Sequence, residues 1–143
     1  MAADVLLKES YAVARGNFNA AGDASSAIKE VLKRVGISTA IVRRVAIASY
    51  EAELNIIIHS SGGRILLAVS RDKIVLTAED DGPGIPDIAQ AMTEGFSTAP
   101  ESVRQLGFGA GMGLSNMQRC ADDFFITSAP ETGTCITMGF DVR

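Results

Sequence analysis

A long apolar helix with one polar strip is the feature that most constrains the fold of this chain. The residue pattern predicts a helix over residues 38–60, and almost every face of it carries Ile, Val, Ala or Leu. A helix that is apolar all round is normally buried. Yet Glu51, Asn55 and His59 recur every fourth residue, and a step of four drifts only about 40° around the axis. These three side chains therefore form one narrow polar strip.

Burial of that strip needs compensation. An unpartnered buried amide costs roughly 2–7 kcal/mol, and a buried carboxylate costs more. Either a ligand or metal ion, or an internal hydrogen-bond network, must accompany Glu51 and Asn55. From the helix alone these two explanations are equally good, and His59 is explained as well by a bond to a backbone group as by a functional role.

Length and composition narrow the class of protein. We expect a single domain over residues 1–143, because 47% of the residues are hydrophobic and 21% charged, as in globular proteins. The net charge is −4 without a long basic run, so nucleic acid is not an expected partner. No apolar run approaches the roughly 18–20 residues that span a bilayer, and the first residues lack a signal-peptide pattern. We therefore expect a cytoplasmic protein with no membrane contact. Cys120 and Cys135 have no metal-ligand spacing and are expected to be reduced.

The other predicted elements are segregated along the chain. They are a strand within 5–14, a helix from Asp23 or Ser25 to Val35 stopped by Gly36, strands 64–70 and 73–78 joined by a two-residue turn, a loop over 79–86, a short helix over 85–92, an aperiodic segment over 93–111, a helix over 113–122, and strands 124–128 and 135–142 around a turn at 130–133. Segregated helices and strands favour an α+β fold with helices on one face of a mixed sheet.

An acidic, glycine-containing segment follows the second strand of the predicted hairpin. Its sequence is Asp80-Asp81-Gly82-Pro83-Gly84-Ile85. The two glycines allow a sharp turn and a close approach to a flat ligand, and a carboxylate at a strand end can accept a hydrogen bond from an exocyclic amine. Asp and Gly dominate ordinary turns, so by itself this segment is better explained as a turn.

Alternating glycines precede the predicted helix at Gly113. The run reads Gly107-Phe108-Gly109-Ala110-Gly111-Met112-Gly113-Leu114-Ser115. Such a run exposes successive backbone N–H groups, and the following helix adds its own N-terminal N–H groups, so a phosphate is the natural ligand. The spacing fits neither the dinucleotide fingerprint nor a P-loop.

Four motifs in this order resemble the nucleotide-binding domain of the GHKL superfamily, which includes gyrase, MutL and the histidine kinases. They are Glu-x-x-x-Asn on a helix, Asp-x-Gly-x-Gly after a strand, a glycine-rich run, and Thr132-Gly133-Thr134 before the last strand. The resemblance covers residues 38–138 and implies the Bergerat fold, a two-layer α+β sandwich with a mostly antiparallel sheet. Within the superfamily, segments 44–55 and 103–114 look like the anti-sigma serine/threonine kinases, and most like the RsbT-type switch kinases of stressosome signalling.

That resemblance implies a role for each motif residue. Asn55 would bind Mg²⁺, and Glu51 would be the general base for a serine or threonine hydroxyl, with its pKa raised by burial. Asp80 would bind the adenine amine with help from Thr134. The residues expected to surround the nucleotide are Gly82, Gly84, Ile85, Gly107, Phe108, Gly109, Ala110, Gly111, Met112, Gly113 and Leu114. Glu53 points elsewhere on the helix and is expected to be structural. Arg43 and Arg44 are expected to form ion pairs or to contact a partner rather than to act in catalysis.

The function implied by the resemblance is an ATP- and Mg²⁺-dependent protein serine/threonine kinase. Its substrates would be STAS-domain proteins in a partner-switching pathway that controls a sigma factor, and a PP2C-type phosphatase would be a second partner. An anti-sigma factor that sequesters a sigma subunit is the main alternative, because the same motifs serve both. A histidine kinase fragment would instead place phosphate on histidine. Small kinases of the anti-sigma branch are often dimers, so a homodimer stays open.

Overall fold

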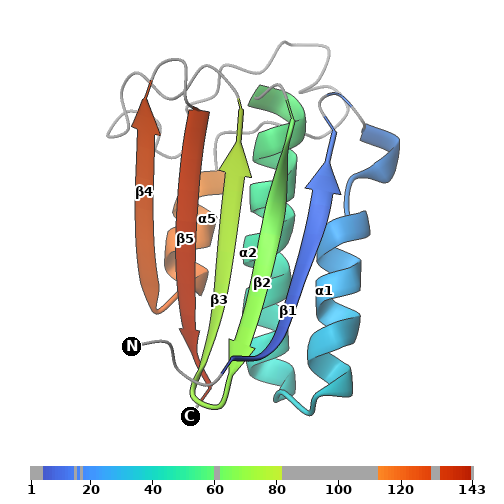
Figure 1. Cartoon of the computed structure of the whole chain (residues 1–143), viewed down its shortest axis with the longest axis vertical. Helices are drawn as coiled ribbons and strands as arrows, with labels where there is room; N and C mark the ends of the chain where they lie inside the picture. The colour runs from blue at the N-terminus through green and yellow to red at the C-terminus, as the bar shows by residue number, and fades with distance from the viewer. Residues whose placement is uncertain are drawn as a thin grey trace.

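Five strands and three α-helices make up the described part of the chain (Figure 1). The computed structural model describes residues 5–14, 16, 18–59, 62–81, 113–129 and 133–142. The elements in chain order are β1 (Val5–Val13), the 3-10 turn η1 (Phe18–Ala20), α1 (Asp23–Arg34), α2 (Thr39–His59), β2 (Gly63–Ser70), β3 (Lys73–Asp80), α5 (Gly113–Cys120), β4 (Asp123–Ala129) and β5 (Gly133–Asp141). The short helix expected over 85–92 and the aperiodic segment over 93–111 lie outside the described residues. No helix in the described ranges is long and apolar enough to cross a membrane.

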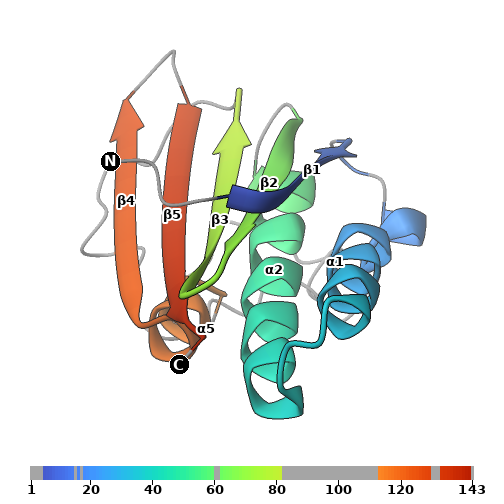
Figure 2. The same cartoon turned by 60° about the horizontal axis from the view of Figure 1, so that its bottom comes forward.

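The strands form one sheet in the order β1-β2-β3-β5-β4. Every strand pair in the described part is antiparallel, so the parallel pairing implied by a mixed sheet is not found there. Figures 1 and 2 show α1, α2 and α5 on the same face of this sheet. The expected two-layer α+β sandwich is therefore confirmed.

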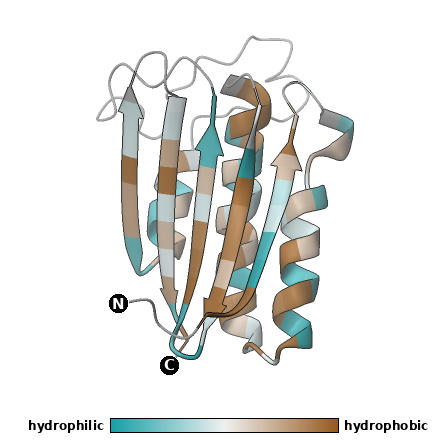
Figure 3. Cartoon of the chain, in the orientation of Figure 1, coloured by the Kyte–Doolittle hydropathy of each residue, from teal (hydrophilic) through white to brown (hydrophobic). Residues whose placement is uncertain are grey.

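The core lies between the helices and the inner face of the sheet. Alternation along the central strands turns one apolar residue in two toward the helices, which fixes the register of each strand. Figure 3 shows this apolar content along β2 and on α2. The inward-facing residues of β2, β3 and β5 are Ile65, Leu67, Val69, Ile74, Leu76, Ala78, Ile136, Met138 and Phe140, and all are buried. Each large one contributes roughly 1.5–3 kcal/mol by leaving water.

Helix α2 packs across the middle of the sheet between α1 and α5. Its buried residues Val42, Val45, Ala52 and Ile56 recur at helical spacing and face the sheet and the flanking helices. The expectation that the helix is buried all round is wrong on one side, where Ile47 is 44% exposed. Three elements can cover only part of a helix surface, so one stripe is left to solvent.

Helix α1 ends where the sequence predicts. Gly36 adopts φ +83°, and the N–H of Ile37 donates to the carbonyl of Leu32 across 3.1 Å. This left-handed residue with a bond back into the last turn is a common way to end a helix, and glycine adopts it without strain.

The strand boundaries at one end of the sheet differ from the prediction. The loop expected from Glu79 is wrong at its start, because Glu79 and Asp80 are the last residues of β3. Asp80 pairs with Gly63, and Glu79 pairs with Cys135 on β5. Backbone pairing on both sides extends the strand where composition alone suggested a turn.

Candidate functional site

Four of the predicted site residues that the structure describes come from three elements. Asp80 ends β3, and Thr134 is the second residue of the neighbouring strand β5. The C-terminal half of α2 carries Glu51 and Asn55 and runs toward the same end of the sheet (Figure 1). The fold therefore directs residues from three separate parts of the sequence toward one end of the molecule.

Asp80 and Thr134 are directly linked. The backbone N–H of Thr134 donates a hydrogen bond to Oδ1 of Asp80 across 3.0 Å. The hydroxyl of Thr134 lies 3.0 Å from the hydroxyl of Ser128 on β4, and Thr134 is buried. The carboxylate of Asp80 is thus oriented at the end of β3 by the first residues of β5.

Gly133 allows this close approach. It has φ +86°, and a Cβ there would lie 2.1 Å from the carbonyl oxygen of Asp80 and 2.9 Å from its Oδ1. Both contacts are too short for any side chain, and the first is to a backbone atom that cannot move alone. Glycine is therefore required for the Asp80 and Thr134 arrangement.

A hollow of about 300 Å³ opens at this end of the sheet. It is lined by Arg64, Glu79, Asp80, Asp81, Thr127, Ser128, Gly133, Thr134 and Cys135. Arg64, Glu79, Cys135 and Thr127 are successive cross-strand neighbours. Side chains in one such row share a face of the sheet, and here it is the face away from the helices. The hollow therefore extends from Asp80, at the end of the sheet, onto that face. The Arg64–Glu79 ion pair, 3.0 Å long and exposed, forms part of its wall.

Glu51 lies half-buried on α2, beside the first residue of α5. Its Oε2 is 3.2 Å from the place a Cβ would occupy on Gly113. Burial raises the pKa of the Glu51 carboxyl, and a hydrogen bond with the Asn116 side chain partly offsets that rise. The expected direction of the pKa shift is confirmed.

Asn55 follows Glu51 by four residues on the continuous helix α2, and its side chain is partly exposed. Residues four apart on a helix have neighbouring Cβ atoms, so the amide and the carboxylate share one face. Within the described ranges, no group of three or more His, Cys, Asp or Glu side chains could hold a metal ion. The side chain of His59 lies outside the described residues.

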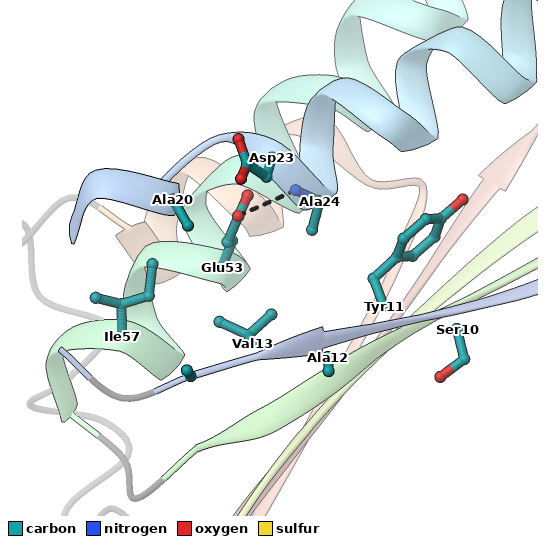
Figure 4. A pocket seen from close by; sticks show the side chains of 10 residues that line it. Ser10, Tyr11, Ala12, Val13, Ala20, Asp23, Ala24, Glu53 and Ile57 are labelled. Atoms are coloured by element: carbon teal, nitrogen blue, oxygen red, sulfur yellow. Dashed lines mark hydrogen bonds between the residues drawn. The ribbon is translucent and has the colours of Figure 1, made fainter. Parts of the chain in front are cut away.

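Glu53 has the structural role that the sequence suggests. Its two carboxylate oxygens accept the backbone N–H groups of Ala24 and Ser25, across 3.1 Å and 3.2 Å, at the start of α1. Figure 4 shows the side chain reaching from α2 to that helix end, beside a hollow that Tyr11 and Ile57 also line. Only 2% of Glu53 is exposed, so it satisfies N–H groups that would otherwise be buried without partners.

Arg44 also behaves as expected. Its guanidinium donates to the carbonyl oxygen of Cys120, across 2.8 Å, and pairs with Asp122 at 3.0 Å. It lies over the Phe140 ring, 5.9 Å from the ring centroid. These contacts fix the C-terminal end of α5 to α2 and β5.

Nine predicted nucleotide-contacting residues lie outside the described residues: Gly82, Gly84, Ile85, Gly107, Phe108, Gly109, Ala110, Gly111 and Met112. Gly113 and Leu114 are described at the start of α5, where Leu114 is buried in the core.

Three residues at the site were missed by sequence reasoning. Arg64 could have been found, because the turn at residues 71–72 fixes the hairpin register and so places Arg64 opposite Glu79. Asn116 and Ser128 carry no such local signal, since their contacts with Glu51 and Thr134 depend on how separate elements pack.

Comparison with protein families gives one match over most of the chain. Residues 42–143 match the family described as histidine kinase-, DNA gyrase B-, and HSP90-like ATPase. The matched region contains Glu51, Asn55, Asp80, Thr134 and the glycine-rich run.

Named relatives are similar over regions of comparable length. The chain is 34% identical over 110 residues to the serine/threonine-protein kinase RsbT of Bacillus subtilis, covering 74% of this chain and 77% of RsbT. It is 42% identical over 92 residues to the anti-sigma F factor of Bacillus licheniformis, covering 60% of each protein.

A solved structure shares the fold. The structure of the RsbU and RsbW domains of Rv1364c from Mycobacterium tuberculosis superposes with a TM-score of 0.65 over 96% of this chain and 33% of the other, at 15% identity. At that identity the likeness concerns the fold alone.

Proposed function

Because the chain belongs to the family of histidine kinase-, DNA gyrase B- and HSP90-like ATPases, we propose that it is an ATP- and Mg²⁺-dependent protein serine/threonine kinase. The family match supports ATP as the nucleotide. Similarity to RsbT, which is named a serine/threonine-protein kinase, supports transfer of the phosphate to a protein hydroxyl.

The setting of Glu51 is the observation that carries the proposal. A half-buried carboxylate with a raised pKa is a suitable acceptor for the proton of a weakly acidic hydroxyl. In the proposed reaction, the substrate hydroxyl oxygen bonds to the γ-phosphorus while the bond from that phosphorus to ADP breaks. The hydroxyl proton passes to Glu51. Phosphoryl transfer asks for little more than positioning and charge neutralisation.

The adenine would bind at the end of β3. Asp80 would accept the hydrogen bond of the exocyclic amine, with its carboxylate already oriented by the N–H of Thr134. Because residue 133 is glycine, no side chain there pushes Asp80 out of this position. An acceptor fixed in this way distinguishes an amino group from a carbonyl on the base, which favours adenine over guanine.

Mg²⁺ would be held by Asn55. An amide oxygen is a hard, neutral ligand, and Mg²⁺ commonly uses few protein ligands and keeps several waters. The partly exposed position of Asn55, on the same face as Glu51, fits such a ligand set. When bound, Mg²⁺ would supply charge neutralisation on the phosphate oxygens.

Protein partners of the chain are proposed from the RsbT-type resemblance. The substrate would be a STAS-domain protein of a stressosome-like, partner-switching pathway, and a PP2C-type phosphatase would be bound after phosphorylation. The protein would act in the cytoplasm, together with ATP and these partners.

An anti-sigma factor is the second candidate, and the identity of 42% to an anti-sigma F factor favours it. Such a protein would bind a sigma subunit in a nucleotide-dependent way. A pull-down of a sigma factor by the chain, with and without Mg-ATP, separates this activity from kinase activity alone.

Intact-mass analysis tests the proposed kinase. A STAS-domain protein is incubated with the chain and Mg-ATP, and we expect its mass to rise by one phosphate that survives acid. An acid-labile phosphate would indicate transfer to histidine instead. No mass gain, with ATP binding confirmed in the same sample, would contradict the proposed kinase activity on this substrate class.

A further inference from the structure

Helix α5 meets Glu51 through its first turn. Gly113 starts α5, and a Cβ there would come within 3.2 Å of Oε2 of Glu51. A Cβ at that spacing would make a tight contact, so the Glu51 carboxylate would have to shift by a few tenths of an ångström to accept one. Asn116 lies three residues later, on the same face of α5 as Gly113.

Asn116 is the hydrogen-bond partner of the Glu51 side chain. When Glu51 is ionised its carboxylate can only accept hydrogen bonds, so the Asn116 NH₂ group is the donor in this contact. A carboxylate can accept several hydrogen bonds, so this contact alone does not occupy every acceptor position on its two oxygens. The contact therefore orients Glu51 without blocking it.

Both partners are on helices that are fixed relative to each other. Arg44 of α2 binds the Cys120 carbonyl and Asp122 at the other end of α5. Leu114 and Met117, on the neighbouring positions of α5, are buried in the core. Asn116 is therefore presented by a packed element, which positions a group better than a loop does.

We propose that Asn116 is a positioning residue for Glu51, holding its carboxylate in the orientation that accepts the substrate proton. The catalytic part of this inference rests on the proposed function. Asn116 itself touches neither nucleotide nor protein substrate in the proposed reaction, and acts through Glu51.

A hydrogen bond to the ionised form opposes the effect of burial. Removal of Asn116 should therefore raise the pKa of Glu51 further and leave the carboxylate free to rotate. Burial raises the pKa of the Cys120 thiol on α5, and the nearby charge of Glu51 adds to that rise, so the thiol stays neutral well above the range where a carboxyl titrates. The two titrations can thus be told apart.

The first measurement needs no activity. The full chain is labelled with ¹³C at glutamate carboxyls, the Glu51 signal is assigned by its loss in Glu51→Gln, and its shift is followed against pH. We expect Asn116→Ala and the isosteric Asn116→Leu both to raise the Glu51 pKa. Gln118→Ala, at an exposed position on the same helix, should leave it unchanged. An unchanged Glu51 pKa in folded Asn116→Ala or Asn116→Leu overturns the proposal.

The second measurement connects the contact to transfer. At saturating Mg-ATP, Asn116→Ala should lower the rate of phosphate transfer roughly 10- to 100-fold, as expected for a misplaced reacting group, without changing ATP affinity. The acid limb of its pH–rate profile should move to higher pH. A lower rate with an unmoved acid limb would mean that Asn116 only packs α5 against α2. If the wild type transfers no phosphate, the proposed function fails, while the NMR result still decides the Asn116–Glu51 contact.

Discussion

The N–H of Thr134 donates to Oδ1 of Asp80 across 3.0 Å, joining residues 54 positions apart at the end of the sheet. This bond aligns the carboxylate before any ligand arrives. The family resemblance implied that both residues serve one site, and the pairing of β3 with β5 brings them into contact.

Asp80→Asn should abolish tight ATP binding and leave the fold intact. An asparagine carbonyl can still accept the Thr134 N–H, but the charge offered to the adenine amine is lost. A charged hydrogen bond is worth about 1.5–3 kcal/mol, so ATP affinity should fall roughly 10- to 100-fold. Calorimetric titration with Mg-ATP measures this. The neighbouring substitution Asp81→Asn is the control, and equal losses in both variants would contradict the role of Asp80.

Gly133→Ala should destabilise the protein more than Gly36→Ala. Both glycines have nearly the same φ, +86° and +83°, so the backbone strain of about 1–3 kcal/mol is shared. Only at Gly133 would the new Cβ strike a backbone atom, since nothing lies within 4 Å of that position at Gly36. Urea unfolding of the two variants gives the difference directly. Equal losses of unfolding free energy would show that the Asp80 backbone is free to move away.

Glu53→Ala should cost several times more stability than Glu30→Ala. Loss of the Glu53 carboxylate leaves the buried N–H groups of Ala24 and Ser25 unpaired, at about 1–3 kcal/mol each. Glu30 is exposed on α1, where a substitution changes stability by about 0.5 kcal/mol or less. The unfolding free energies of both variants are read from urea titrations. A cost at position 53 no larger than at position 30 would rule out the capping role.

Stability should depend on pH through Glu51 in a defined direction. Its folded pKa is raised above the ordinary value of 4.5, so its protonated form is favoured in the native state. The resulting stabilisation is present below about that ordinary value and is lost as pH rises through the folded pKa. Glu51→Gln keeps the shape without the charge. The stability of Glu51→Gln relative to wild type should therefore be greater at pH 7 than at pH 4, and the reverse trend would contradict the raised pKa.

Much of the fold could be predicted because it follows from local patterns. The apolar repeat of α2, the stop signal at Gly36 and the two-residue turn after Ser70 gave the long helix, the end of α1 and the hairpin almost to the residue. The boundary at Asp80 was wrong because strand pairing with Gly63, a tertiary contact, outweighs the turn preference of Asp and Gly.

The candidate site could be predicted only as separate motifs. Spacing on one helix related Glu51 to Asn55, and the motif order related both to Asp80 and Thr134. The partners that orient these groups are not visible in the sequence. Asn116 reaches Glu51 from another helix. Glu53 accepts hydrogen bonds from backbone N–H groups at the start of α1, which precedes it in the chain. Such contacts depend on the packing angle of whole elements.

The most direct test of the central claim compares Glu51→Gln with Glu30→Gln. Both replace one carboxylate by an amide, but Glu30 is exposed on α1, away from the site. ATP binding is measured by calorimetry, and phosphate transfer to a STAS-domain protein by intact mass, in the same preparations. The account predicts that Glu51→Gln binds ATP and transfers no phosphate, while Glu30→Gln behaves as wild type in both. Undiminished transfer by Glu51→Gln would show that Glu51 is not the base.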